Sequence, residues 1–385
     1  MVRRPRLDQG ELMRVQLIAK REAGISGTSR YTEAIQRGLL EAGVDVHLTF
    51  PAPPPLPSPM IEALNRFGVD LTTFLAGCPL RARLDSADIY HIATQTMATL
   101  LCFQRFPRPV VVTVLDIIPH LVRGDRELDT SRHAVERLFY RLALSGLKRA
   151  DALIAISEYT KRTLVEALDL AADRIHVIYP AVDHERFHPL DVPDEFRARH
   201  GLGSEWRYVL CVGSDDPRKN LSTLLQALAL AKQQLAKVKL IKVGSSHFPR
   251  EHERLMDLVE ALDLQGHVLF LDRVPDEELP LLYNLADVLA MPSLYEGFGL
   301  PVAEAMACGT PVVCSRAGAL PEAAGDSAIL VKARDAAALA AAIAGVLEDQ
   351  LLRKKMTERG QARAAMFTWK NTAEQLVQLY EKYRR

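Results

Sequence analysis

The sequence has few cysteines, no net charge and no long apolar run in its 385 residues. Its cysteines have neither metal-ligand spacing nor a pairing pattern, so we expect reduced thiols and a cytoplasmic location. They are Cys78, Cys102, Cys211, Cys308 and Cys314. No segment is long and apolar enough to span a membrane, and the basic first 14 residues lack the apolar stretch of a signal peptide.

An excess of one charge is also missing, because Lys plus Arg and Asp plus Glu each total 48. A balanced charge gives no general attraction to nucleic acid. The apolar content of 48% and the charged content of 25% are typical of a soluble globular protein. The length favours two or three domains.

The most informative segment is 292–313, PSLYEGFGLPVAEAMACGTPVV. Short apolar runs at 287–291 and 311–314 predict buried strands on either side of a glycine turn. Because proline suits the first turn of a helix, Pro301 predicts a helix that begins at Leu300 or Pro301 and ends before Gly309. The unit is therefore strand, glycine turn, helix, strand.

Two carboxylates, Glu296 and Glu304, flank this turn. Free backbone N–H groups at a helix start attract phosphate, and carboxylates accept hydrogen bonds from sugar hydroxyls. Both demands are met by one ligand, a nucleotide diphosphate sugar. Glu304 has a simpler interpretation as well, since glutamate in a first turn offsets the helix dipole.

The first half of the chain offers weaker signals at the ends of predicted strands. The loop with Gly24 and Gly27 follows a strand at 13–19 and precedes a helix at 29–41, so it is either a phosphate cradle or an ordinary turn. Asp116 follows a strand at 110–115, at the rim where ligands bind in parallel sheets. Ser157 opens a helix after a strand at 151–156 and is explained equally well as its N-cap.

Basic side chains suggest anion contacts in two places. Arg218 and Lys219 lie in the loop 213–220 after a strand at 208–212, where they can neutralise phosphate or form part of the surface. A helix expected at 130–149 carries Arg132, Arg137, Arg141, Lys148 and Arg149. It is either a solvated face or a contact with anionic lipid, and the latter would put the protein at the inner face of the membrane. The proline-rich stretch 51–59 is a surface connector or, less simply, a partner-binding motif.

The whole string around Glu296 resembles the glutamate, seven residues, glutamate signature of retaining glycosyltransferases of family 4, and most closely bacterial mannosyltransferases. This resemblance implies an α/β GT-B fold of two Rossmann-like, doubly wound domains that face each other across a donor-binding cleft. We place the domains at 1–190 and 191–385, with the last helix, about 370–385, crossing back to the first domain.

The resemblance also implies roles for individual residues. Glu296 would hold hydroxyls of the transferred sugar, Glu304 the ribose, and the backbone of Phe298, Gly299 and Leu300 the sugar and diphosphate. Lys219 matches the phosphate-binding lysine of the family directly. Further donor contacts are implied for Gly24, Gly27, Ser157, Gly213, Arg273 and Val274, the last two through main-chain recognition of the base.

Two positions depart from the family pattern. The arginine that many members carry immediately after Gly213 is replaced by Ser214, so Arg218 is our candidate for its role. The histidine that usually precedes Asp116 is Leu115 here, and His120 is a candidate to compensate. Asp116 stays a candidate for contact with the acceptor or the transferred sugar.

The implied activity is retaining transfer of a hexose, with mannose and GDP-mannose favoured, to a hydroxyl of a saccharide or lipid-linked acceptor. No Asp-x-Asp motif adjoins the diphosphate site, so no metal or other cofactor is expected. The alternatives are a UDP-glucose-dependent glucosyltransferase, a sugar-nucleotide epimerase and a non-catalytic module that binds nucleotide sugars.

Overall fold

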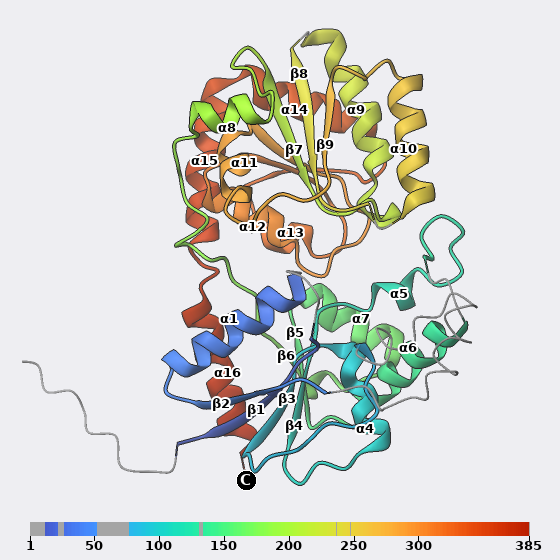
Figure 1. The fold of residues 1–385 in the computed structure, drawn as a ribbon, viewed down its shortest axis with the longest axis vertical. Coiled ribbons are helices and arrows are strands. Elements are labelled where there is room, and N and C mark those ends of the chain that lie inside the picture. Colours follow the sequence, from blue (N-terminus) through green and yellow to red (C-terminus); the bar gives the residue numbers. More distant parts are fainter. Residues whose placement is uncertain are drawn as a thin grey trace, which may run out of the picture.

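The computed structural model describes residues 12–21, 27–51, 77–130, 134–235, 237–246 and 248–384. The described residues form two halves, one above the other in Figure 1, and each half is built on a six-stranded parallel sheet. The Gly24 position and the proline-rich stretch after Pro51 lie outside the described residues. Within the described part no helix has the length and hydropathy needed to cross a bilayer.

The first sheet has the strand order β2-β1-β3-β4-β5-β6. Its strands are β1 Arg14–Ile18, β2 Asp45–Thr49, β3 Ile89–Ile92, β4 Val110–Val114, β5 Ala152–Ala155 and β6 Ile175–Val177. The helices and 3-10 turns of this half are α1 Gly27–Glu41, η1 Gln95–Thr99, α4 Leu100–Phe103, α5 Ile118–Leu121, α6 Ala134–Leu147, α7 Glu158–Leu168 and η2 Ala172–Arg174. The central strands β3, β4 and β5 are buried at every position, as expected of a parallel sheet covered on both faces.

The second sheet has the order β12-β11-β10-β7-β8-β9. Its strands are β7 Arg207–Val212, β8 Val238–Val243, β9 Val268–Leu271, β10 Val288–Met291, β11 Val312–Ser315 and β12 Ile329–Val331. The helical elements of the rest of the chain are α8 Asp194–Arg199, η3 Pro217–Lys219, α9 Leu221–Gln234, α10 Pro249–Ala261, α11 Leu279–Leu285, α12 Leu300–Ala307, α13 Leu320–Ala324, α14 Ala336–Glu348, α15 Gln350–Ala364 and α16 Trp369–Tyr383. The predicted fold class, two doubly wound α/β units, is confirmed.

Some predicted elements are shorter or different in the structure. The helix predicted at 130–149 is α6, which the structure describes from Ala134 to Leu147. The helical segment between β3 and β4 consists of η1 and α4. The edge strand β6 was not predicted, because its three residues carry a histidine and offer too short a pattern. The predicted domain boundary near residue 190 falls between β6 and β7 and stays a prediction.

The last helix, α16, lies beside α1 on the first half although it is the C-terminal element (Figure 1). The hydroxyl of Tyr380 lies 2.7 Å from Nδ1 of His91 in β3, and both side chains are buried. A Cβ atom on Gly38 in α1 would lie 3.1 Å from Cβ of Ala373, so glycine allows the two helices to approach closely. Thus the end of the chain is packed into the core of the first half.

Candidate active site

The turn with Glu296 lies between the carboxyl end of β10 and the start of α12. Gly299 has a φ of 102°, a conformation that favours glycine, and Pro301 occupies the first turn of the helix. A Cβ atom on Gly318 would collide with the backbone of Glu296, and the N–H of Ala319 donates to the Glu296 carbonyl at 3.1 Å. The predicted strand, glycine turn and helix are confirmed, and the loop with Gly318 and Ala319 packs against the turn.

Glu296 is buried between two cations of the second half. Nζ of Lys219 lies 2.7 Å from Oε1 of Glu296, and Nη1 of Arg218 lies 3.4 Å from Oε2. Burial by itself would raise the pKa of Glu296, but Lys219 and Arg218 outweigh it and hold this pKa below its usual value. The carboxylate is therefore ionised at neutral pH and able to accept hydrogen bonds.

The loop 213–220 is held in shape by its own acids. Asp216 accepts from the backbone N–H of Arg218 at 3.0 Å and from its Nε at 3.1 Å. Asp215 is fully buried, where it pairs with Lys242 and lies 2.7 Å from Nδ1 of His252. These contacts fix the direction in which Arg218 and Lys219 leave the loop.

Gly213, at the start of this loop, has a φ of 151°. A Cβ atom on it would lie 3.2 Å from Cε of Lys219, so a side chain there would crowd the lysine stem. Gly213 therefore packs against the side chain of Lys219.

Asp116 belongs to the first half of the chain and lies close to Glu296, Arg218 and Lys219 of the second half. A Cβ atom on Gly297 would collide with the carbonyl of Leu115 and lie 3.2 Å from Cβ of Asp116. Burial raises the pKa of Asp116, with Glu296 acting in the same direction and Arg218 and Lys219 opposing it. The four predicted catalytic residues, Asp116, Arg218, Lys219 and Glu296, therefore lie in one charged cluster.

Glu304 lies in α12 beside a separate cavity of about 310 Å³. Tyr283 donates a hydrogen bond of 2.7 Å to its Oε2, and burial raises the pKa of Glu304 above the usual value. The same cavity is lined by Gly27 and Leu300, so it brings together predicted donor-binding residues from both halves.

Three residues of this cavity were missed by sequence reasoning. Asp276 forms ion pairs with Arg30 of α1 and with Arg186 of the connection between the sheets. Positions 30, 186 and 276 are far apart in the chain and carry no local motif, so only the tertiary structure reveals their contact. The two arginines place positive charge beside Glu304.

Other predicted donor-binding residues lie outside the two cavities. Arg273 is exposed and Val274 packs against the core, and neither lines a cavity described here. The Phe298 ring is buried between Tyr179 and Phe367, so only its backbone is left for a ligand.

Ser157 is a buried N-cap, because its hydroxyl accepts from the N–H of Thr160 at 2.9 Å. Thr160 in turn lies 3.4 Å from the carbonyl of Gly297, so this cap is close to the turn of the second half. The N-cap role of Ser157 is thus confirmed, and its contact with the donor stays a prediction.

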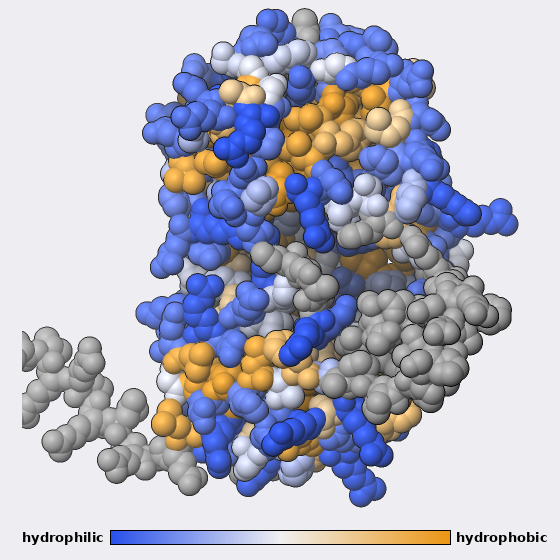
Figure 2. Space-filling model, viewed as in Figure 1, coloured by the Kyte–Doolittle hydropathy of each residue, from blue (hydrophilic) through white to orange (hydrophobic). Residues whose placement is uncertain are grey.

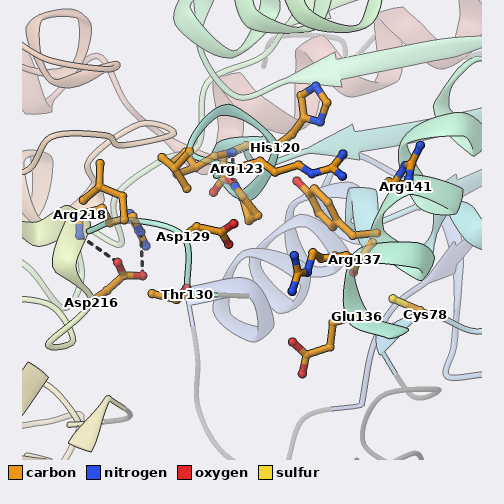
Figure 3. A pocket seen from close by; sticks show the side chains of 17 residues that line it. Cys78, His120, Arg123, Asp129, Thr130, Glu136, Arg137, Arg141, Asp216 and Arg218 are labelled. Atoms are coloured by element: carbon orange, nitrogen blue, oxygen red, sulfur yellow. Dashed lines mark hydrogen bonds and ion pairs between the residues drawn. The ribbon is translucent and has the colours of Figure 1, made fainter. Parts of the chain in front are cut away.

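A second, larger cavity of about 430 Å³ adjoins the charged cluster (Figure 3). It is lined by Asp116 and Arg218 of the cluster and by His120, Arg137 and Arg141 of the first half. Figure 2 shows apolar residues inside a hollow between the two halves. The basic helix α6 thus presents Arg137 and Arg141 to a cavity.

Two family models match nearly the whole chain. Residues 25–186 match "Glycosyltransferase Family 4", and residues 192–363 match "Glycosyl transferases group 1". The division between the two matches falls in the segment that connects the sheets.

Named relatives agree with these matches. The O-antigen chain mannosyltransferase B of Escherichia coli is 34% identical over 61% of this chain and 62% of its own length. The MMP alpha-(1->4)-mannosyltransferase of Mycolicibacterium hassiacum is 30% identical over 81% of this chain and 77% of its own. This chain therefore spans less than two thirds of the first relative and more than three quarters of the second.

The fold is shared with a solved structure, that of Anabaena Alr3699/HepE in complex with UDP-glucose. The two structures superpose with a TM-score of 0.72 at 21% identity, over 96% of this chain and 99% of the other. The fold is GT-B, with two sheets and a cleft between them. The chain belongs to glycosyltransferase family 4, and its second half is a group 1 glycosyl transferase domain.

Proposed function

We propose that this protein transfers a hexose from a nucleotide diphosphate sugar to a hydroxyl of a saccharide or lipid-linked acceptor. The transfer retains the anomeric configuration and uses no metal ion. Mannose is the favoured sugar and GDP-mannose the favoured donor, because the two relatives named above are mannosyltransferases.

The observation that carries this proposal is the cluster of Glu296, Lys219, Arg218 and Asp116. An ionised carboxylate, two cations and a second carboxyl group from the opposite half converge at the division between the sheets. A sugar hydroxyl is a donor for Glu296, and a diphosphate is an anion for Lys219 and Arg218.

The departing nucleotide diphosphate needs its negative charge stabilised in the transition state. Lys219, Arg218 and the free N–H groups at the start of α12 supply positive charge that is already in place. In comparable roles, one such donor contributes roughly 3 kcal/mol. This is why we propose a reaction that does not need a metal ion.

The nucleoside part of the donor fits the cavity beside Glu304. Glu304 would accept from a ribose hydroxyl, after exchange of its hydrogen bond with Tyr283, and Arg30 and Arg186 line the same cavity. Gly27 at the start of α1 leaves open space there, since a Cβ atom on it would meet nothing within 4 Å.

UDP-glucose is the second candidate donor, because the Anabaena structure contains it and has the same fold. A screen of GDP-mannose and UDP-glucose against saccharide and lipid-linked acceptors tests the choice. Transfer from either donor supports the transferase. Proton NMR of the product gives the anomeric configuration, and activity after dialysis against EDTA tests the proposed independence of metal ions.

Two outcomes of the same screen would contradict the proposal. Inversion of the sugar at C2 without transfer would indicate a sugar-nucleotide epimerase. Tight binding of a nucleotide sugar with neither hydrolysis nor transfer would indicate a module that binds without catalysis.

A further inference from the structure

The 430 Å³ cavity reaches from the charged cluster into the first half of the chain. Its boundary with the cluster is formed by Asp116 and Arg218, so a molecule in this cavity would lie next to a sugar held by Glu296. In the view of Figure 3 the Arg218–Asp216 pair lies at one side and Arg137 and Arg141 lie at the other. This is the place from which an acceptor hydroxyl could approach.

The acids of the cavity already have partners within the protein. Asp216 pairs with Arg218, Asp116 accepts from the N–H of Ile118 at 3.0 Å, and Asp129 accepts from the N–H of Gly124 at 2.9 Å. Glu136 also takes part in an interaction. None of these contacts is made with Arg123, Arg137 or Arg141.

Three arginines of the cavity have no such partners among the residues that the structure describes. Arg123, Arg137 and Arg141 all line it, all three are exposed, and none of their side chains makes an ion pair or hydrogen bond within the described part of the chain. They come from two elements, the turn after α5 and the helix α6. Three guanidinium groups without partners around one cavity favour a ligand with more than one negative charge.

The cavity also has features suited to a sugar. Ile118, Val122 and Leu128 form an apolar cluster on which Leu294 and Tyr295 of the second half pack. The hydroxyl of Tyr140 is buried at the cavity and has no hydrogen-bond partner. An apolar floor and an unused hydroxyl match the C–H face and the hydroxyls of a saccharide ring.

We propose that the acceptor is a phosphorylated saccharide, and that Arg123, Arg137 and Arg141 bind its phosphate or diphosphate while the sugar lies on the apolar floor. This proposal rests on the proposed function and defines its acceptor class. The phosphate can belong to a soluble sugar phosphate or to the diphosphate of a lipid-linked sugar. Arginine suits both, because its planar fork donates two parallel hydrogen bonds to phosphate oxygens.

The first test compares acceptors that share one sugar and differ only in the attached group. They are the octyl glycoside, the sugar 1-phosphate and the octyl glycosyl diphosphate, each with the donor identified by the screen. We expect kcat/KM for a phosphorylated acceptor to exceed that for the octyl glycoside at least about tenfold, through a lower KM. Preference for the sugar 1-phosphate would indicate a soluble acceptor, and preference for the octyl diphosphate a lipid-linked one.

Variants then assign the preference to the arginines. Arg137→Ala and Arg141→Ala should each remove most of it, while kcat/KM for the octyl glycoside changes less than about twofold. Arg126→Ala is the matched control, because Arg126 is exposed on the same part of the chain and does not line the cavity. Equal losses for all acceptors, or a preference that survives in both variants, would overturn the proposal.

A second measurement does not depend on the choice of sugar. Inorganic pyrophosphate is titrated calorimetrically into the Lys219→Ala protein, in which the donor phosphate site is weakened, and into the Lys219→Ala/Arg137→Ala/Arg141→Ala protein. We expect the dissociation constant to be at least about tenfold higher in the latter. Equal constants would overturn the proposal.

Failure of this proposal is distinguishable from failure of the proposed function. A wild-type protein that transfers sugar equally well to all three acceptors contradicts only the phosphate site. A wild-type protein that neither transfers sugar nor hydrolyses a donor contradicts the transferase itself.

Discussion

Nζ of Lys219 lies 2.7 Å from Oε1 of Glu296, although 77 residues separate the two positions in the sequence. Both side chains are largely buried, with exposed fractions of 12% and 8%. A buried ion pair is costly to break, because the remaining partner keeps an uncompensated charge. In the proposed reaction the two groups share one ligand, with Glu296 on the sugar and Lys219 on the diphosphate.

Substitution of either residue should therefore abolish most of the activity. We expect Lys219→Ala and Glu296→Ala each to lower kcat by about a hundredfold or more, as the loss of a preorganised electrostatic contact does in other enzymes. The measurement is steady-state transfer with the preferred donor. Turnover at the wild-type rate in both purified variants would remove the site assignment.

A matched control for this experiment is Lys232→Ala. Lys232 also pairs with a carboxylate, Asp263 at 2.8 Å, but on the exposed surface at the end of α9. Such surface pairs contribute little, so we expect wild-type turnover in this variant. Circular dichroism of all variants separates a loss of activity from a loss of folding.

Gly297→Ala should weaken the approach of the two halves. The added Cβ would collide with the carbonyl of Leu115, which is backbone and cannot rotate away. Displacing Asp116 from Glu296 by about 1 Å should lower kcat/KM by about a hundredfold. Small-angle scattering should show an increased radius of gyration, while circular dichroism should still show two folded sheets.

Gly266→Ala serves as the control for this substitution. A Cβ atom on Gly266 would meet nothing within 4 Å, and neither glycine has a positive φ, so backbone strain is absent from both variants. Unchanged turnover and unchanged scattering in Gly297→Ala would show that this contact does not hold the halves together.

Glu304 should make stability fall as the pH rises above about 4.5. Its pKa in the folded protein is raised by burial from 4.5, so below 4.5 it is protonated in both states and its stabilising contribution is complete. Above 4.5 the unfolded chain loses this proton first, and the contribution declines until the pH passes the raised pKa. The Glu304→Gln variant lacks this titration.

The measurement is urea unfolding of wild type and Glu304→Gln at several pH values between 4.5 and 7.5. We expect the variant to gain stability relative to wild type across this range. A difference that stays constant, or that moves in favour of wild type as the pH rises, contradicts the raised pKa.

His91 should make the stability of the folded protein fall as the pH drops below about 6.5, whereas Glu304 makes it fall as the pH rises. Burial lowers its pKa to about 3, and its ring nitrogens lie 2.7 Å from the hydroxyls of Thr113 and Tyr380. Between pH 6.5 and about 3 the unfolded chain binds a proton that the folded protein does not, so stability rises with pH. The largest slope from this one group is about 1.4 kcal/mol per pH unit.

Urea unfolding of wild type and His91→Gln between pH 5 and 7 checks this slope. The variant should show a flatter dependence on pH, because it lacks the titrating ring and keeps polar atoms near Tyr380. Equal slopes would show that His91 is protonated in the folded protein.

Several features of the site could be predicted from short stretches of sequence. The helix start at Leu300, the turn at Gly299 and the loop that carries Arg218 and Lys219 are local, because glycine and proline restrict the backbone at their own positions. The position of Asp116 after β4 followed from the rule that ligands bind at the carboxyl ends of parallel strands.

Other features could not be predicted, because they depend on contacts between distant parts of the chain. The pairs of Asp276 with Arg30 and Arg186 join three separate segments. The sequence left two interpretations of the helix that carries Arg137 and Arg141, a solvated face or a contact with anionic lipid. Only the tertiary structure, in which α5 and α6 line the same cavity, shows that these side chains face a possible ligand.

The sequence by itself determined the two doubly wound halves, the glycine turn and the chemical types of the candidate residues, since these depend on local backbone preferences and on the alternation of strands and helices. The tertiary structure decided which charged side chains form ion pairs, such as Glu296 with Lys219 and Arg218. Ion pairing and burial depend on distances between side chains, and the approach of Gly297 to Leu115 sets those distances for residues from both halves.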